Sequence, residues 1–172
     1  MQTPHLLLRP WALEDADAWF NILQEDGILR YFPNQTPPSR EKAEPYITHH
    51  LTHWRTRGYG HWAVVTKLDG QVVGWCGLEY LTDLDETEVA YLLSKRVWGR
   101  GYATEAARAA VQFGFGSTGL EKIIGLVHPE NLGSVHVLEK CGLNFADRIT
   151  LWGMELSRYR INRTTYEDKQ SS

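Results

Sequence analysis

The sequence predicts a mixed α+β protein with helices packed on a central sheet. With 172 residues, the chain is long enough to bury one substantial core. Its content of 42% hydrophobic and 23% charged residues is ordinary for a globular protein. Short apolar runs bounded by turn residues indicate strands, and apolar residues three or four apart indicate helices. These patterns follow the order β-α-α-β-β-β-α-β-α-β-β, which predicts the mixed class.

The first third of the chain predicts one strand and two helices. Residues 6–8 form a short apolar run that ends before a proline. A helix is expected to begin near Glu14, where acidic residues favour a helix amino end. A second helix is expected after Ser39, a suitable cap, and to run to about Arg57. Residues 27–38 between the two helices contain three prolines and predict a loop that carries exposed aromatic side chains. The buried stripe of the first helix is expected to comprise Ala16, Trp19, Phe20 and Leu23.

The remainder of the chain predicts further strands and two more helices. Strands are expected at residues 61–65, 71–78, 88–93, 123–127, 145–152 and 154–161, and helices at residues 104–115 and 132–140. Asp69 and Gly70 form a strong hairpin turn signal between two apolar runs. Gly142 suits the left-handed stop of the last helix. We expect a single domain over the whole chain, with its core at about residues 3–162 and residues 163–172 as a frayed polar tail.

A glycine-rich turn joins the strand at residues 88–93 to the next helix. Gly99 and Gly101 permit backbone conformations closed to other residues and let main-chain N–H groups approach a ligand. The helix that follows points its amino end at the same place, where its dipole favours an anion. Arg96 and Arg100 add positive charge. The pattern therefore predicts a site for a pyrophosphate group.

Two other phosphate-binding motifs fit this turn poorly. The P-loop requires Lys and then Ser or Thr after its second glycine, where this chain has Tyr102 and Ala103. The dinucleotide fingerprint requires a third glycine, where Thr104 stands. It also requires an acidic residue at the end of the next strand, where His128 and Pro129 stand. A tight turn that binds nothing is the remaining alternative, and the residues downstream argue against it.

Two motifs occur in order in the second half of the chain. Arg-x-x-Gly-x-Gly-x-Ala occupies residues 96–103, and Asn131 and Ser134 precede Glu-Lys-Cys-Gly-Leu at residues 139–143. They resemble the Gln/Arg-x-x-Gly-x-Gly/Ala signature of the GNAT acyltransferase superfamily and its second motif, Asn-x-x-Ser leading to Glu-Lys-x-Gly-Phe. The resemblance spans about residues 3–160. It implies the α+β GNAT acyl-CoA N-acyltransferase fold, in which a mixed, mostly antiparallel sheet has a V-shaped splay and helices on both faces.

Two stretches are similar to one branch of that superfamily. Leu-Leu-Leu-Arg-Pro at residues 6–10, with Glu-Asp-Ala at residues 14–16, resembles the entry of the RimJ/RimL branch, the ribosomal-protein N-terminal acetyltransferases. So does Trp-Gly-Arg-Gly-Tyr-Ala-Thr-Glu-Ala at residues 98–106, with Tyr91 before it. The likeness implies an acetyltransferase that acts on amines.

The resemblance implies acetyl-CoA as the co-substrate. The main chain of Leu92, Leu93 and Ser94 would pair with the pantetheine arm like an added strand, and an N–H near Leu93 would bind the thioester carbonyl. Asn131 would bond the arm near its thiol end. The implied pyrophosphate contacts come from the Arg96 and Arg100 side chains and from the backbone of Val97, Trp98, Gly99, Arg100, Gly101, Tyr102 and Ala103.

Direct acetyl transfer needs a base for the amine and a proton for the leaving thiolate. Glu88 is the leading base, because it opens the strand that would carry the cofactor; a solvated strand-end acid is the alternative interpretation. Asp85 and Glu86 are lesser candidates, and a water relay remains open. Many GNAT enzymes carry a tyrosine acid where this chain has Leu138, so the resemblance leaves Ser134 as the candidate acid.

Aromatic residues in the N-terminal half are candidates for contact with the acceptor amine. Tyr31 and Phe32 lie in the loop, and Trp54 lies in the second helix. In that helix His49 and His53 have the i,i+4 spacing of a metal pair, but the chain lacks the glutamate of the HExxH motif. We therefore expect no metal.

Composition limits the remaining functions. The net charge of −3 argues against a general nucleic-acid binder. Cys76 and Cys141 form no CxxC pair, which argues against a zinc site and for two free thiols in a reducing compartment. No signal pattern or membrane-length apolar run is present, so we expect a cytoplasmic protein.

The sequence predicts an N-acetyltransferase that uses acetyl-CoA directly, without a covalent enzyme intermediate. The acceptor is a protein N-terminal α-amine or a small-molecule amine, and the protein is a monomer or a homodimer. The alternative is a non-catalytic acyl-CoA-binding regulatory domain, which the loss of tyrosine at Leu138 favours and which Asn131 and Ser134 oppose.

Overall fold

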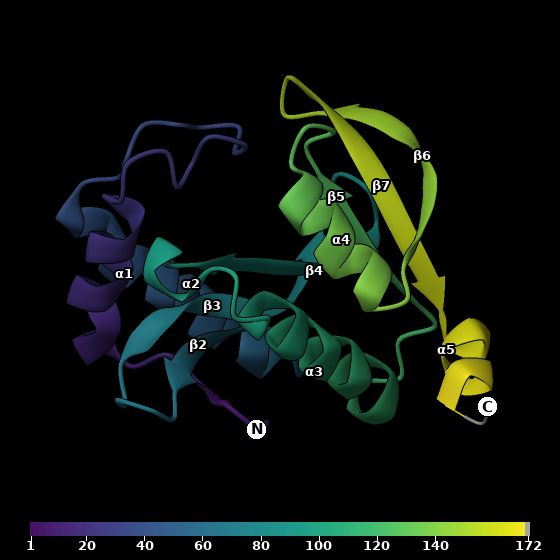
Figure 1. The fold of residues 1–172 in the computed structure, drawn as a ribbon, viewed down its shortest axis with the longest axis horizontal. Coiled ribbons are helices and arrows are strands. Elements are labelled where there is room, and N and C mark those ends of the chain that lie inside the picture. Colours follow the sequence, from purple (N-terminus) through teal and green to yellow (C-terminus); the bar gives the residue numbers. More distant parts are fainter. Residues whose placement is uncertain (171–172) are drawn as a thin grey trace.

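A seven-stranded sheet forms the centre of the molecule (Figure 1), seen in a computed structural model that describes residues 1–170. Its order is β1-β2-β3-β4-β5-β7-β6. Neighbouring strands are antiparallel except β4 and β5. The strands are β1 (Leu6–Arg9), β2 (His61–Thr66), β3 (Val72–Leu81), β4 (Glu86–Leu93), β5 (Lys122–Val127), β6 (Asn144–Leu151) and β7 (Met154–Asn162). The predicted mixed, mostly antiparallel sheet is confirmed.

Helices cover both faces of the sheet, and the alternation of side chains along the strands explains why. Ala63, Trp75 and Leu92 belong to one buried cluster with α1 (Ala16–Leu23) and α2 (Ala43–Arg57). The neighbouring strand residues Val64 and Val89 point the other way, into a second cluster. That second cluster packs against α3 (Tyr102–Ser117) and α4 (Leu132–Lys140).

The sheet opens between β4 and β5. Antiparallel pairing with β3 runs along the whole of β4, but β4 and β5 share a single registered pair, Glu88 with Ile124. In Figure 1 the two strands diverge from this point, so that β5 and β7 stand at a steep angle to β4. The V-shaped splay implied by the resemblance is therefore present, and it leaves the Leu93 end of β4 without a neighbour on that side.

The ends of three elements differ from their predicted positions. The α-helical part of α2 starts at Ala43 after a 3₁₀ turn, and the Ser39 side chain makes no capping hydrogen bond, so that part of the prediction is wrong. Strand β4 starts at Glu86, because this residue is held by Lys122 of β5 and Arg158 of β7. Helix α3 starts at Tyr102 because Gly101 adopts φ +77° directly before it.

The frayed tail expected at residues 163–172 is wrong for residues 163–170, which form α5 (Arg163–Gln170). Arg163 fastens the start of this helix by donating hydrogen bonds to the carbonyls of Phe115 and Leu120. The Tyr166 ring lies 4.9 Å from the Phe115 ring. The contacts of Arg163 and Tyr166 thus dock this polar segment on the core, and composition alone did not reveal them. Residues 171 and 172 lie outside the described part.

Two expectations from composition can be compared with the structure. Cys76 and Cys141 are both buried free thiols, as predicted. Within residues 1–170, no helix combines the length and the apolar character that crossing a bilayer requires.

Candidate active site

A cleft of about 800 Å³ lies where the sheet opens. Its wall combines the end of β4, the turn before α3, the start of α4 and the loop after α1. Of the residues expected to bind cofactor, the cleft is lined by Leu92, Leu93, Val97, Trp98, Gly99, Gly101, Tyr102, Ala103 and Asn131. Segments far apart in the sequence therefore meet at one site.

The glycine turn has the geometry of an anion-binding cradle. Gly99 and Gly101 have φ of +75° and +77°, conformations that other residues adopt only with strain. A side chain added at either position would meet no atom within 4 Å, so the space in front of both glycines is open. The first helical bond of α3 runs from the Glu105 N–H to the Gly101 carbonyl. The N–H groups of the three residues before Glu105 therefore have no acceptor within the helix and can serve a ligand.

The main chain of Leu93 points away from β3. The Ser94 N–H donates to the Val73 carbonyl at 2.7 Å, and Leu93 is registered with Gly74. Hydrogen-bonding direction alternates along an antiparallel strand, so the N–H and C=O of Leu93 face the edge that β5 leaves open. The Trp98 indole N–H donates a hydrogen bond of 2.7 Å to the Leu93 carbonyl. The Leu93 N–H is thus aimed at the cleft side.

Three of the expected cofactor residues do not line the cleft. The Ser94 hydroxyl is buried and donates to the Glu25 carboxylate at 2.5 Å, which fastens this turn to the end of α1. The Arg96 guanidinium pairs with Asp69 of the β2–β3 hairpin at 3.2 Å. Arg100 is exposed and outside the lining. The guanidinium groups of both arginines, which were expected to contact the pyrophosphate, therefore lie outside the lining of the cleft.

Asn131 and Ser134 enter the cleft at the amino end of α4. The Asn131 side-chain oxygen Oδ1 caps the helix by accepting from the Ser134 N–H at 3.2 Å. The Tyr91 hydroxyl donates to the Ser134 main-chain carbonyl at 3.1 Å, which ties β4 to α4 across the splay. Sequence reasoning missed this role of Tyr91. Leu138 is buried with its side chain against Gly125, so its position belongs to the core.

The three carboxylates considered as bases have different environments. Glu86 forms ion pairs with Lys122 at 2.5 Å and Arg158 at 2.7 Å. Its pKa is held below the usual value by these two cations, which outweigh the opposing effect of burial. Glu86 is therefore a structural ion-pair partner, and its candidacy as a base is wrong. Asp85 is exposed in a left-handed turn and accepts a hydrogen bond from the Tyr80 hydroxyl at 2.5 Å.

Glu88 lies on the sheet face that α1 and α2 cover, partly buried and directly opposite Glu79 of β3. Burial, and after it the charge of Glu79, raises the pKa of Glu88 to about 8. Glu88 is not among the residues that line the cleft, and Leu92 lies four positions further along the strand, about 13 Å away. A carboxyl group with this pKa takes up and releases protons near neutral pH.

Tyr31 and Phe32 line the cleft from the loop after α1, as expected. The Tyr31 ring lies 5.2 Å from the ring of His128, which follows β5, so the loop reaches across the opening. Trp54 does not reach the cleft. Its ring packs 4.9 Å from Trp62 and 5.6 Å from Phe113, and its indole N–H donates to the His61 carbonyl. The expected acceptor contact of Trp54 is therefore wrong, because this side chain helps to fill the core.

Comparison with known proteins now identifies the class. Residues 5–144 match the family Acetyltransf_3, described as an acetyltransferase (GNAT) domain. The chain belongs to the GNAT acetyltransferase family, and it is a GNAT-family N-acetyltransferase.

Two curated relatives cover nearly the whole chain. YkkB of Bacillus subtilis strain 168 is 33% identical over 164 residues, which span 91% of this chain and 92% of that protein. The uncharacterized N-acetyltransferase p20 of Bacillus licheniformis is 28% identical over 163 residues, 94% of this chain and 90% of its own length.

A solved structure shows the same fold. The spermidine N-acetyltransferase from Vibrio cholerae, in complex with CoA and spermine, superposes with a TM-score of 0.77. The match covers 94% of this chain and 98% of that one, at 20% identity. The GNAT fold implied by the motifs is therefore confirmed.

Proposed function

We propose that this protein transfers the acetyl group of acetyl-CoA directly to a primary amine, with CoA held in the cleft between β4 and α4. One observation carries the proposal: the open N–H edge at Leu93 and the empty space before Gly99 and Gly101 belong to the same cleft. An extended pantetheine arm with a pyrophosphate at one end has matching requirements, namely main-chain partners along its length and N–H donors at its anion.

The orientation of the cofactor follows from these two ends. The pyrophosphate lies at the glycine turn and the amino end of α3. The arm runs along residues 92–94, with Asn131 beside it, and the thioester carbonyl accepts the Leu93 N–H. That hydrogen bond strengthens as negative charge develops on the carbonyl oxygen during attack. The Vibrio cholerae enzyme, of the same fold, binds CoA, which supports this use of the cleft.

Glu88 is the proposed base, and Ser134 is the proposed acid. The raised pKa of Glu88 suits proton removal from an ammonium group near neutral pH. Because Glu88 lies outside the cleft lining, a water between the carboxylate and the amine is the simplest route for the proton. The Ser134 hydroxyl lines the cleft and would protonate the leaving thiolate.

The acceptor is a protein N-terminal amine or a small-molecule amine, and Tyr31 and Phe32 would contact it. The RimJ/RimL-like motifs support the first acceptor, and the spermine bound to the Vibrio cholerae enzyme supports the second. The two free buried thiols support a cytoplasmic location. The alternative, a non-catalytic acyl-CoA-binding domain, gains no support from the site.

The test is CoA thiol release from acetyl-CoA, measured against a panel of polyamines, amino acids and peptides with free N-termini. We expect turnover with at least one class of amine and none with N-terminally blocked peptides. CoA affinity is measured in parallel by calorimetry. CoA binding without turnover on any amine would leave the protein as a non-catalytic binder, and absence of both would overturn the cleft assignment.

A further inference from the structure

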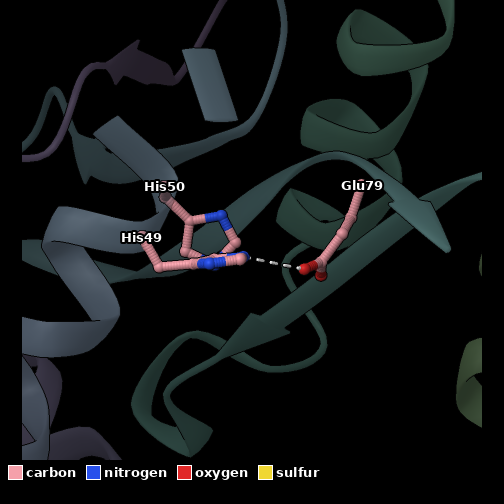
Figure 2. A group of neighbouring side chains, drawn as sticks. All are labelled: His49, His50 and Glu79. Atoms are coloured by element: carbon pink, nitrogen blue, oxygen red, sulfur yellow. Dashed lines mark hydrogen bonds and ion pairs between the residues drawn. The ribbon is translucent and has the colours of Figure 1, made fainter. Parts of the chain in front are cut away.

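A second group of polar side chains lies on the α1/α2 face of the sheet, outside the cleft. His49 and His50 of α2 point toward Glu79 of β3 (Figure 2). One ligand-type atom from each of the three residues lies within 4.8 Å of the other two. His50 is buried with 2% of its surface exposed, and His49 and Glu79 are more accessible. The group is therefore closed on one side and open to solvent on the other.

The buried His50 ring has a nitrogen that no other described group of the protein uses. The Nδ1 atom of His50 is buried and has no hydrogen-bond partner in the described part of the chain. His61 stacks on His50 with ring centroids 4.0 Å apart. Neutral imidazole offers a lone pair to a cation.

The surrounding charges favour a cation. Glu79 faces the Glu88 carboxylate across the strand pair, and its ion pairs within residues 1–170 are with histidines only, His49 at 3.4 Å and His61 at 3.5 Å. The other ionisable groups that face it are His50, His53 and Tyr46. Within residues 1–170, no lysine or arginine is paired to Glu79. A bound dication would offset the charge of this carboxylate.

The sequence pattern suggested a different pair, His49 and His53, and the structure excludes His53. Its Nδ1 bonds the Tyr59 carbonyl at 2.7 Å, and its Nε2 accepts the Tyr80 N–H at 3.3 Å. Both ring nitrogens are therefore occupied. The candidate metal ligands are therefore His49, His50 and Glu79.

We propose that His49, His50 and Glu79 bind a divalent transition metal, with zinc as the best fit. Two imidazole nitrogens and one carboxylate oxygen form a common zinc ligand set, and three protein ligands leave a fourth position for water. The His49 Nε2 atom lies 3.4 Å from the Glu79 Oε1 atom. Ligand atoms bound to zinc at about 2.0 Å in a tetrahedron are about 3.3 Å apart, so this pair needs little movement. The absence of metal expected from the sequence is thus replaced by a defined candidate site.

The test uses the full chain after treatment with a chelator. Zinc titrated by calorimetry should bind at one equivalent, and the melting temperature should rise with zinc. His49→Ala and Glu79→Gln should each weaken zinc affinity at least about tenfold, whereas His136→Ala, which removes an exposed histidine of α4, should not. Cobalt should give the intense visible absorption of a four-coordinate complex.

These measurements test the zinc site independently of the proposed acetyl transfer, because none of them uses acetyl-CoA. No stoichiometric zinc binding by the wild-type chain would overturn the site. Binding that is equally strong in His49→Ala and Glu79→Gln would also overturn it, by showing that zinc binds elsewhere. His50 is buried, so His50→Gln is compared only after circular dichroism shows that it is folded.

Discussion

Glu88 combines two properties that oppose each other. Its position opposite Glu79 and its partial burial disfavour the charged form, which weakens the folded state at high pH. The same environment gives it a pKa of about 8, close to what proton transfer at neutral pH needs. The proposed role as a base and the stability of the fold therefore place opposite demands on this carboxyl group, and both can be measured.

Glu88→Gln should lower kcat/KM about 100-fold or more, because general bases typically contribute that much. In the wild type the base acts when deprotonated, so kcat/KM should rise with pH and level off above about 8. The variant should lose this rise while its CoA affinity is unchanged. A full pH–rate profile checks the prediction, and an identical profile in the variant would exclude Glu88 as the base.

The same substitution should stabilise the protein at pH 8. A carboxyl group whose folded pKa lies above its unfolded pKa of about 4.5 binds its proton more tightly in the folded state. The contribution of this carboxyl group to the free energy of unfolding is fully present below pH 4.5 and is lost as pH rises toward 8. Melting temperatures of Glu88→Gln and wild type should therefore differ more at pH 8 than at pH 5. A constant difference would contradict the raised pKa.

Ser134→Ala should slow turnover about tenfold or more if the hydroxyl supplies the proton for the thiolate. The Tyr91 hydrogen bond goes to the Ser134 main-chain carbonyl, so this substitution leaves the link between β4 and α4 in place. Steady-state kinetics should be measured with acetyl-CoA and with an acetyl thioester whose thiol is a poorer leaving group. The rate loss caused by Ser134→Ala should be larger with the second donor. Equal rates for variant and wild type would leave Ser134 as a helix-start residue only.

At the residue scale, motifs predicted main-chain contacts better than side-chain contacts. The glycines, Asn131 and Ser134 line the cleft because the backbone path fixes them. The Arg96 and Trp54 side chains lie outside the cleft lining because their long-range partners, Asp69 and Trp62, decide where they point. No local pattern encodes these partners.

The glycine turn and α3 form the element that should decide CoA affinity. Gly101→Ala places a methyl group in the open space where the pyrophosphate is proposed to lie, and forces alanine into a left-handed conformation. We expect at least a tenfold loss of CoA affinity, about 1.4 kcal/mol. The conformational strain should cost about 1–2 kcal/mol of stability.

Gly119→Ala, just beyond the other end of α3, is the matched control. Its φ is +72° and its Cβ would also meet open space, so the strain is similar and the distance from the cleft is large. Calorimetric CoA titration of both variants separates the effect of the added methyl group at the glycine turn from the effect of backbone strain. A similar loss of affinity in the two would mean that the strain, and not the methyl group, disturbs binding.

The order of the elements before α5 was predictable from apolar periodicity, but α5 itself and the ends of the elements were not. Each predicted strand and helix is present in the predicted order. The ends moved where tertiary contacts decided them: β4 extends to Glu86 because Lys122 and Arg158 hold it, and α5 forms because Tyr166 reaches Phe115. Periodicity reports the buried face of an element and carries no information about such partners.

On the scale of the whole molecule, the cleft lies between two parts of the sheet. Strands β1 to β4 pair continuously, as do β5, β7 and β6, and one registered pair joins the two sets. Further links between the sets include the Glu86 ion pairs with Lys122 and Arg158 and the hydrogen bond from Tyr91 to α4. CoA in the cleft would touch both sets.

CoA should therefore slow amide hydrogen exchange on both sides of the splay. Protection should increase at Leu93, at the first turn of α3 and at the start of α4, while the β1–β2 pair, far from the cleft, changes little. Exchange measured by mass spectrometry with and without CoA checks this. Protection limited to one side of the splay would contradict a ligand that bridges the two sets.

The single registered pair between β4 and β5 has a consequence for how the chain unfolds. Backbone pairing joins the two strand sets at this one pair, and the other links between them are side-chain contacts. One set can therefore open before the other, so the ligand-free protein should depart from all-or-none melting. CoA would supply the missing cross-strand partner and merge the two transitions into one. The co-substrate would then stabilise the folded state in addition to donating the acyl group.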